Sequence, residues 1–172
     1  MEEKPQTVSL TYYGISPWEI EVIYDIFNQK FSIIQEETEQ NKETFVSSLT
    51  IHIPLPFSEE FFKWFEFKAW EKVKSIIKEM KRRRGKGNAI VVEIVFTGKP
   101  SVRFVADLNE NHHFNSAVEK IDFVVELLPY HLNDNNITND STEVLYKYDI
   151  VCLLYTSPSP RDRSVSRMPS SA

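Results

Sequence analysis

Alternating apolar and polar residues predict six β-strands along the chain. The pattern is clearest in residues 45–53, where Leu49, Ile51 and Ile53 fall on one face and polar residues on the other. The acidic stretch after the second strand and the polar stretch at 133–141 are typical of loops. The remaining strands are predicted at residues 7–13, 31–37, 89–97, 101–108 and 143–150.

Two of these strands form the clearest predicted hairpin, because only the Gly-Lys-Pro sequence at 98–100 separates them. Placing Phe96 opposite Val102 brings Val92, Ile94, Phe104 and Ala106 onto the same face, and the opposite face, which is half apolar, is expected to be partly covered. The same register pairs Ile94 with Phe104.

Three helices are predicted between the strands, and the first has the strongest start signal. In the Ser-Pro-Trp-Glu sequence at 16–19, the serine caps the helix, the proline suits its first turn and the glutamate completes a capping box. This helix extends to about Lys30. The third helix is predicted over about 112–128 and ends at Pro129.

The second helix is predicted to run unbroken over residues 59–84. Ser58 caps its start, and the basic residues at 81–84 followed by Gly85 mark its end. At 1.5 Å per residue this helix would be ~39 Å long, about twice the ~17–20 Å of a typical strand. We therefore expect its basic end to project beyond the sheet into solvent.

The order of these elements predicts a single α+β domain at residues 1–151. Residues 7–97 follow the order β-α-β-β-α-β, which resembles the split βαβ core of ferredoxin-like proteins, and a further β-α-β follows. The resemblance implies a mainly antiparallel sheet with the helices packed on one face. Since this fold carries many unrelated activities, it indicates no function by itself.

The C-terminal residues break with this pattern. Residues 152–172 are rich in Ser, Pro and Arg and resemble a translated transposase-type sequencing adapter. Residues 152–162 match the transposase end and primer site, and 166–172 match the flow-cell end. We therefore expect 152–172 to be an artefactual, disordered tail, and the native chain to be truncated after about residue 150.

Composition and charge are those of an acidic globular protein. The chain has 172 residues, of which 41% are apolar and 26% charged, and a net charge of −5. Excluding the tail removes three arginines and one aspartate, which leaves −7. No apolar run approaches the ~18–20 residues of a membrane span, and the acidic N-terminus is unlike a signal peptide. We therefore expect a cytoplasmic protein with no membrane partner.

Cysteine and the common catalytic motifs add no chemistry to this picture. The only cysteine, Cys152, lies in the predicted tail, which excludes a disulfide or a thiolate site within the domain. The chain also lacks the glycine-rich phosphate-binding loops, the zinc-protease motif and the serine-hydrolase motif. No cofactor or metal ion is expected.

Aromatic residues of the second helix form the first candidate site. Phe62 and Phe65 belong to its inward stripe, which leaves other aromatic residues on a flank that one sheet cannot cover. Exposed aromatic residues commonly anchor protein interfaces, whereas packing against the third helix is the alternative. The predicted interface consists of Phe61, Trp64, Phe67 and Trp70.

The basic end of the same helix is the second candidate, as a phosphate-binding site for nucleic acid. Six engaged charges would make binding to duplex DNA strongly salt-dependent. The acidic balance of the domain argues against it, and basic residues also stabilise the C-terminal end of a helix dipole. The residues are Lys78, Lys81, Arg82, Arg83, Arg84 and Lys86.

Asp107, His112 and His113 form the third candidate, for metal or acid–base chemistry. Asp107 lies near the end of a strand and the histidines at the start of the next helix, where a neutral imidazole is favoured. Adjacent helical residues point ~100° apart, so His112 and His113 do not easily share one metal ion.

The favoured interpretation is a non-catalytic module for protein–protein interaction or assembly. It works through a protein partner or through self-association. A nucleic-acid-binding accessory domain is the second interpretation, and a small metal-dependent or acid–base enzyme is the third.

Overall fold

The computed structural model describes residues 6–40, 44–132, 143–149, 154–155 and 159–160. Six principal strands form one mixed sheet in the order β2-β1-β3-β4-β5-β6. Their bounds are β1 Thr7–Tyr13, β2 Ser32–Glu37, β3 Ser47–Ile53, β4 Ile90–Phe96, β5 Ser101–Ala106 and β6 Glu143–Asp149. The helical elements are α1 Pro17–Phe27, α2 Glu59–Phe65, α3 Phe67–Arg84, α4 Asn111–Glu119, the 3₁₀ turn η1 Asp122–Glu126 and α5 Leu128–Leu132.

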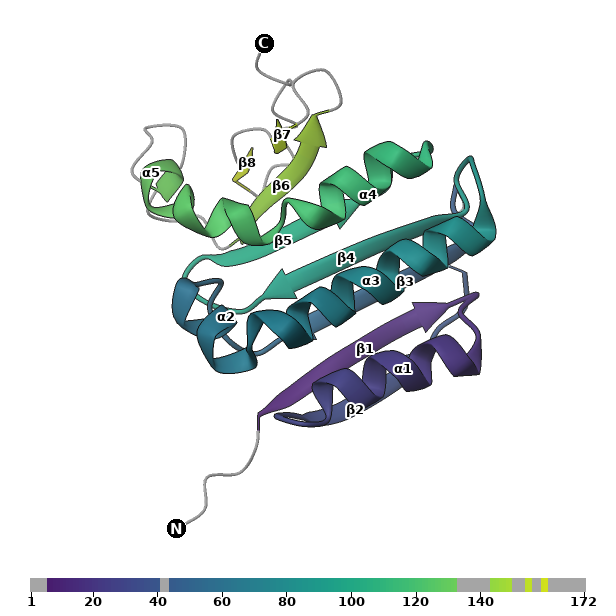
Figure 1. The fold of residues 1–172 in the computed structure, drawn as a ribbon, viewed down its shortest axis with the longest axis horizontal. Helices are drawn as coiled ribbons and strands as arrows, with labels where there is room; N and C mark the ends of the chain where they lie inside the picture. The colour runs from purple at the N-terminus through teal and green to yellow at the C-terminus, as the bar shows by residue number, and fades with distance from the viewer. Residues whose placement is uncertain (1–5, 41–43, 133–142, 150–153, 156–158, 161–172) are drawn as a thin grey trace.

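The sheet consists of three adjacent β-α-β units. Within each unit the two strands are parallel neighbours: β1 with β2, β3 with β4, and β5 with β6. Successive units join through the antiparallel pairs β1–β3 and β4–β5. In Figure 1 α1, α3 and α4 all lie on the same side of the sheet.

The ferredoxin-like prediction is wrong in its strand order. A split βαβ core has another strand between the two strands that a helix connects, whereas β1 pairs directly with β2 along residues 7–12. The expected mainly antiparallel sheet is also wrong, because parallel pairs outnumber antiparallel ones among the six principal strands. The order of elements along the chain does not determine which strands become neighbours, so the alternation pattern left this open.

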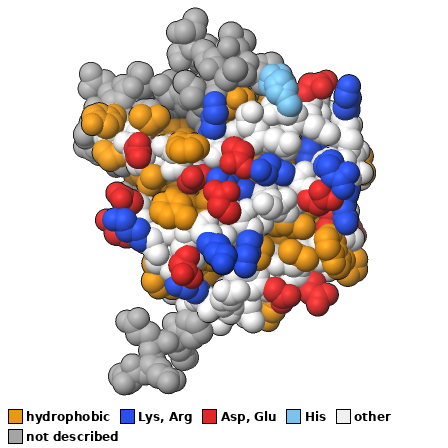
Figure 2. Space-filling model, viewed as in Figure 1, with side chains coloured by type: hydrophobic (Ala, Val, Ile, Leu, Met, Phe, Trp, Pro, Cys, Tyr) orange, Lys and Arg blue, Asp and Glu red, His pale blue; other side chains and the backbone are white. Residues whose placement is uncertain are grey.

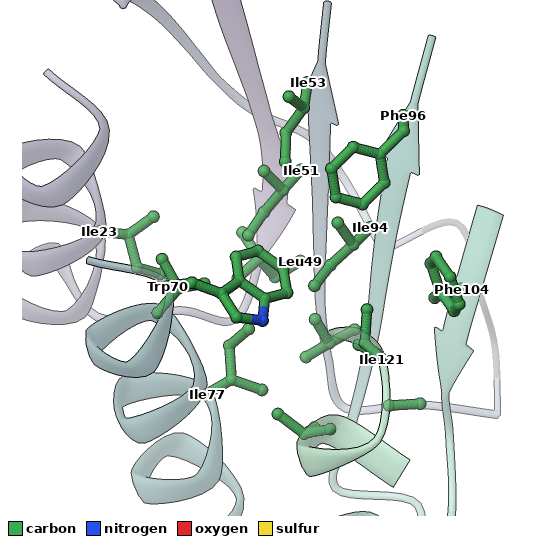
Figure 3. Close-up of a cluster of buried hydrophobic side chains, with 14 of the residues drawn as sticks. Ile23, Leu49, Ile51, Ile53, Trp70, Ile77, Ile94, Phe96, Phe104 and Ile121 are labelled. Carbon is green, nitrogen blue, oxygen red and sulfur yellow. The ribbon is translucent and has the colours of Figure 1, made fainter. Parts of the chain in front are cut away.

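The hairpin register is confirmed. Phe96 pairs with Val102 and Ile94 with Phe104, as the shared apolar face requires. These side chains lie in the core between the sheet and α3 (Figure 3), where Trp70 and Ile77 point from the helix toward the strands. Trp70 is fully buried.

The unbroken second helix is a wrong prediction, because the chain bends at Glu66. Glu66 has φ 76°, which ends α2 and begins α3. The bend turns the short α2 so that Phe61, Phe62 and Phe65 are all buried. A straight helix could not bury that many adjacent side chains beneath one sheet.

The third predicted helix is also interrupted. α4 ends at Glu119, and the chain continues through η1 into α5. Pro129 does not stop a helix here: it is the second residue of α5, where no intrahelical bond needs its missing N–H.

Some predictions fall outside the described residues. The loop predicted at 133–141 and most of the predicted tail are among them. Leu154–Tyr155 (β7) and Ser159–Pro160 (β8) are described, and both pair antiparallel with β6. None of the helices in the described part of the chain combines the length and the hydrophobicity that a membrane span requires.

Candidate functional site

The predicted aromatic interface is divided between core and surface. Phe61 stacks on Phe65 with ring centroids 5.3 Å apart, and Trp70 packs edge-on against Phe62 at 5.2 Å. Phe61 and Trp70 are therefore buried and unavailable to a partner. Trp64 and Phe67 are 45% and 49% exposed.

Two residues that were not predicted extend the exposed pair. Phe123 is 64% exposed and Leu127 49% exposed, and both belong to the region of η1. We call Trp64, Phe67, Phe123 and Leu127 the aromatic surface. Figure 2 shows hydrophobic side chains gathered over α2, the start of α3 and η1 on the helical face. The sequence signal for this second pair was the spacing of four residues between Phe123 and Leu127, because residues four apart lie on the same side of a helix.

Asp122 holds η1 beside α3 and so positions Phe123. Its carboxylate accepts a hydrogen bond from Trp70 Nε1 at 3.3 Å and from Lys74 Nζ at 3.1 Å. Lys74 also pairs with Glu71 at 2.8 Å and Glu119 at 3.3 Å. Burial would lower the pKa of Lys74, but these carboxylates outweigh it and raise that pKa. The buried contacts of Asp122 with Lys74 and Trp70 therefore fix the position of η1, which carries Phe123.

The basic end of α3 does not project freely into solvent, contrary to prediction. Lys81 is fully buried, and its ammonium donates to the carbonyl oxygens of Gly87 at 3.2 Å and Asn109 at 2.9 Å. Burial lowers the pKa of Lys81, while the charge of Glu110 opposes this. Lys81 thus ties the end of α3 to two loops and is not available to a phosphate.

Arg84 is engaged with the start of α1. Its guanidinium contacts both carboxylate oxygens of Glu19 at 2.8 Å and donates to Gly14 O at 3.1 Å. Gly14 has φ 67°, and a Cβ there would lie 2.6 Å from the carbonyl oxygen of Val46, so only glycine fits. Burial would raise the pKa of Glu19, but the hydrogen bonds from Arg84 and Ser16 outweigh it and lower that pKa.

The other basic residues are mostly paired as well. Lys78 pairs with Glu119, and Arg82 and Arg83 both pair with Glu79. The hydrogen bond from Arg82 lowers the pKa of Glu79 to about 2. Of the six predicted phosphate ligands, Lys86 alone has no such contact among the described residues, so the geometry gives the nucleic-acid interpretation little support.

Asp107, His112 and His113 do not assemble into a metal site. Asp107 Oδ2 lies 3.8 Å from Lys147 Nζ. The ring centroids of His112 and His113 lie 4.0 Å apart, and the His112 side chain is exposed. His113 Nδ1 is buried without a hydrogen-bond partner in the described part of the chain. Within the same residues, no cluster of three or more His, Cys, Asp or Glu side chains could hold a metal ion.

The sheet face opposite the helices carries a charged row. Arg103 pairs with Glu93 at 3.4 Å and with Glu143 at 3.0 Å. His52 is close to this row, and burial together with the charge of Arg103 lowers its pKa despite the two carboxylates.

We expect His52 to make folding stability fall as the pH drops below about 6.5. The unfolded chain protonates His52 at a higher pH than the native protein, because the native pKa is lowered. Urea unfolding midpoints measured between about pH 5 and 7 should therefore decline less in His52→Gln than in the unaltered protein. His112→Gln is the matched control for an exposed histidine, and equal slopes for both variants would contradict the prediction.

In the described part of the chain, the three candidate sites are thus an exposed aromatic surface, a basic cluster whose charges are mostly paired, and an acid–imidazole group that is not assembled into one site. Comparison with protein families, with curated proteins and with solved structures finds no match for this chain.

Proposed function

We propose that this chain is a protein-interaction module whose aromatic surface binds a second copy of the chain. The observation that supports it is the exposure of Trp64 on α2, Phe67 on α3, Phe123 on η1 and Leu127 directly after η1. Large apolar side chains gathered on a surface are typical of interfaces, and aromatic residues commonly contribute most of the binding energy.

Two charges next to the aromatic surface in the sequence favour a second copy as the partner. Lys68 follows Phe67 in the chain, and Glu126 precedes Leu127. Both side chains are exposed, and neither has an ion-pair partner among the described residues. In the proposed dimer a two-fold axis sets Lys68 of one copy against Glu126 of the other, which makes the surface complementary to itself.

We expect sedimentation velocity to show a concentration-dependent dimer. Trp64→Gln should weaken dimerisation because it removes an apolar anchor, whereas Trp18→Gln should not. Trp18 is the matched control, since it is 50% exposed and lies on α1, away from this surface.

Charge reversal tests the orientation of the two copies. Lys68→Glu and Glu126→Lys should each weaken the dimer, because each places like charges together across the axis. The double variant restores opposite charges and should recover the dimer. A protein that stays monomeric at every concentration, or a double variant weaker than both single variants, would overturn the proposal.

A further inference from the structure

The sheet ends at β2, and the outer edge of this strand is open among the described residues. Ser32 N donates to Gln6 O at 2.9 Å, and Thr38 N donates to Tyr12 O at 2.8 Å. Backbone groups alternate in direction along a strand, so residues 32, 34, 36 and 38 bond toward β1. The N–H and C=O groups of Ile33, Gln35 and Glu37 therefore point outward.

A groove of about 400 Å³ lies beside this edge, between α1 and the strands β1 and β2. Ile15, Pro17 and Ile20 provide its apolar lining. Its polar lining consists of Glu21, Tyr24 and Asp25 from α1, Tyr12 from β1, and Gln35 and Glu37 from β2. The groove thus combines three carboxylates with two aromatic rings.

The carboxylates of the groove are not neutralised within the described structure. Glu21, Asp25 and Glu37 form no ion pair with any described lysine or arginine, and all three are exposed. Their negative charge is therefore available to a cationic ligand. Tyrosine rings beside carboxylates suit the aliphatic stem and charged head of lysine or arginine.

We propose that the β2 edge and this groove together bind an extended segment of a partner protein that carries Lys or Arg at every second position. The segment adds to the sheet as a further strand, with its backbone bonded to Ile33, Gln35 and Glu37. Every second side chain of an added strand faces the helical side, where Glu37 and Gln35 also point. Those side chains enter the groove.

The spacing of side chains along the bound segment matches the spacing of the carboxylates along α1. Alternate side chains of a strand are ~6.6 Å apart, and Glu21 and Asp25 are one helical turn apart, about 5.4–6 Å along α1. Two successive basic side chains on the groove side of the segment can thus each meet one of these carboxylates. A run of consecutive basic residues would turn half of them away, toward Ile34 and Glu36 on the opposite face.

Fluorescence anisotropy with labelled synthetic peptides tests the proposal. A peptide that alternates lysine with threonine should bind, and a peptide of the same composition with contiguous lysines should bind about tenfold more weakly. Glu21→Gln combined with Asp25→Asn should weaken the alternating peptide by about tenfold or more and reduce its salt dependence.

Gln35→Pro tests the strand edge separately from the charge. Proline removes an outward N–H and leaves the bonds to β1 intact, as edge strands tolerate. It should abolish binding of the alternating peptide, whereas Gln35→Thr, which keeps the N–H, should bind as the unaltered protein does. Thermal unfolding of both variants verifies that the sheet is retained.

Three outcomes would overturn the proposal. The first is no binding of the alternating peptide. The second is equal binding of the two lysine arrangements with no effect of Gln35→Pro, which would indicate unspecific attraction to an acidic surface. The third is competition by lysine amide at the same concentration as the peptide, which would indicate a site for a small cation instead of a strand.

Discussion

Trp70→Ala is expected to lower the free energy of unfolding by about 3–5 kcal/mol. Trp70 is fully buried, and its indole packs against Phe61, Phe62 and Phe96 at centroid distances of 5.2–6.5 Å. Truncation removes these contacts, leaves a cavity between α3 and the sheet, and deprives Asp122 of one hydrogen-bond donor. Each of these changes destabilises the native state.

Urea denaturation and thermal unfolding measure this effect. For a chain of this size the expected loss lowers the melting temperature by roughly 10 °C. Trp18→Ala is the matched control, because the Trp18 side chain is half exposed and should tolerate removal. Trp70→Phe should cost less than Trp70→Ala, since it retains an aromatic ring. Equal losses for Trp70→Ala and Trp18→Ala would contradict the packing described for α3.

Arg84→Met is expected to cost on the order of 3 kcal/mol, because it leaves the buried carboxylate of Glu19 without its cation. Both oxygens of that carboxylate lie 2.8 Å from the guanidinium, and Glu19 is 2% exposed. Adding Glu19→Leu should recover part of the loss, since it removes the unpaired buried carboxylate, but it also removes the capping-box hydrogen bond from Ser16 N.

Acid titration provides a second test of the ion pair between Glu19 and Arg84. The native pKa of Glu19 is lowered, so its contribution is present above about pH 4.5 and is lost as the pH falls through the native pKa. The difference in free energy of unfolding between the unaltered protein and Arg84→Met should therefore shrink as the pH drops below about 4.5. Arg82→Met, which removes an exposed contact with Glu79, should leave stability nearly unchanged. A difference between the unaltered protein and Arg84→Met that is constant from neutral to acidic pH would contradict this interpretation.

Glu19 illustrates how far local patterns reach. The capping box with Ser16 was predicted, and it is confirmed: Ser16 Oγ accepts from Glu19 N, and Ser16 N donates to the Glu19 carboxylate at 3.1 Å. The pairing with Arg84, 65 residues away, carried no local signal. Contacts between distant elements depend on how those elements pack. The basic residues at the end of α3 were therefore predicted to be exposed to solvent, although Lys81 is buried and Arg84 is paired with Glu19.

The candidate surfaces show the same division. Trp64 and Phe67 were predicted to be exposed and are exposed, whereas Phe61 and Trp70 were assigned to the same flank and are buried. The difference arises at Glu66, whose positive φ separates α2 from α3. Helical periodicity assumes an unbroken helix, so Phe61 before the bend and Trp70 after it were assigned to the exposed flank although both are buried.

By itself, the sequence determined the strands, the hairpin register and the capped start of α1, because these depend on neighbours within a few residues. Only the tertiary structure decided which strands lie side by side, where the long helix bends, and which charges are paired in the interior. It also decided that β2 forms the outer edge of the sheet built by the described residues, beside an acidic groove. These features depend on how whole elements pack, since the burial of one helix limits the positions that remain for the next.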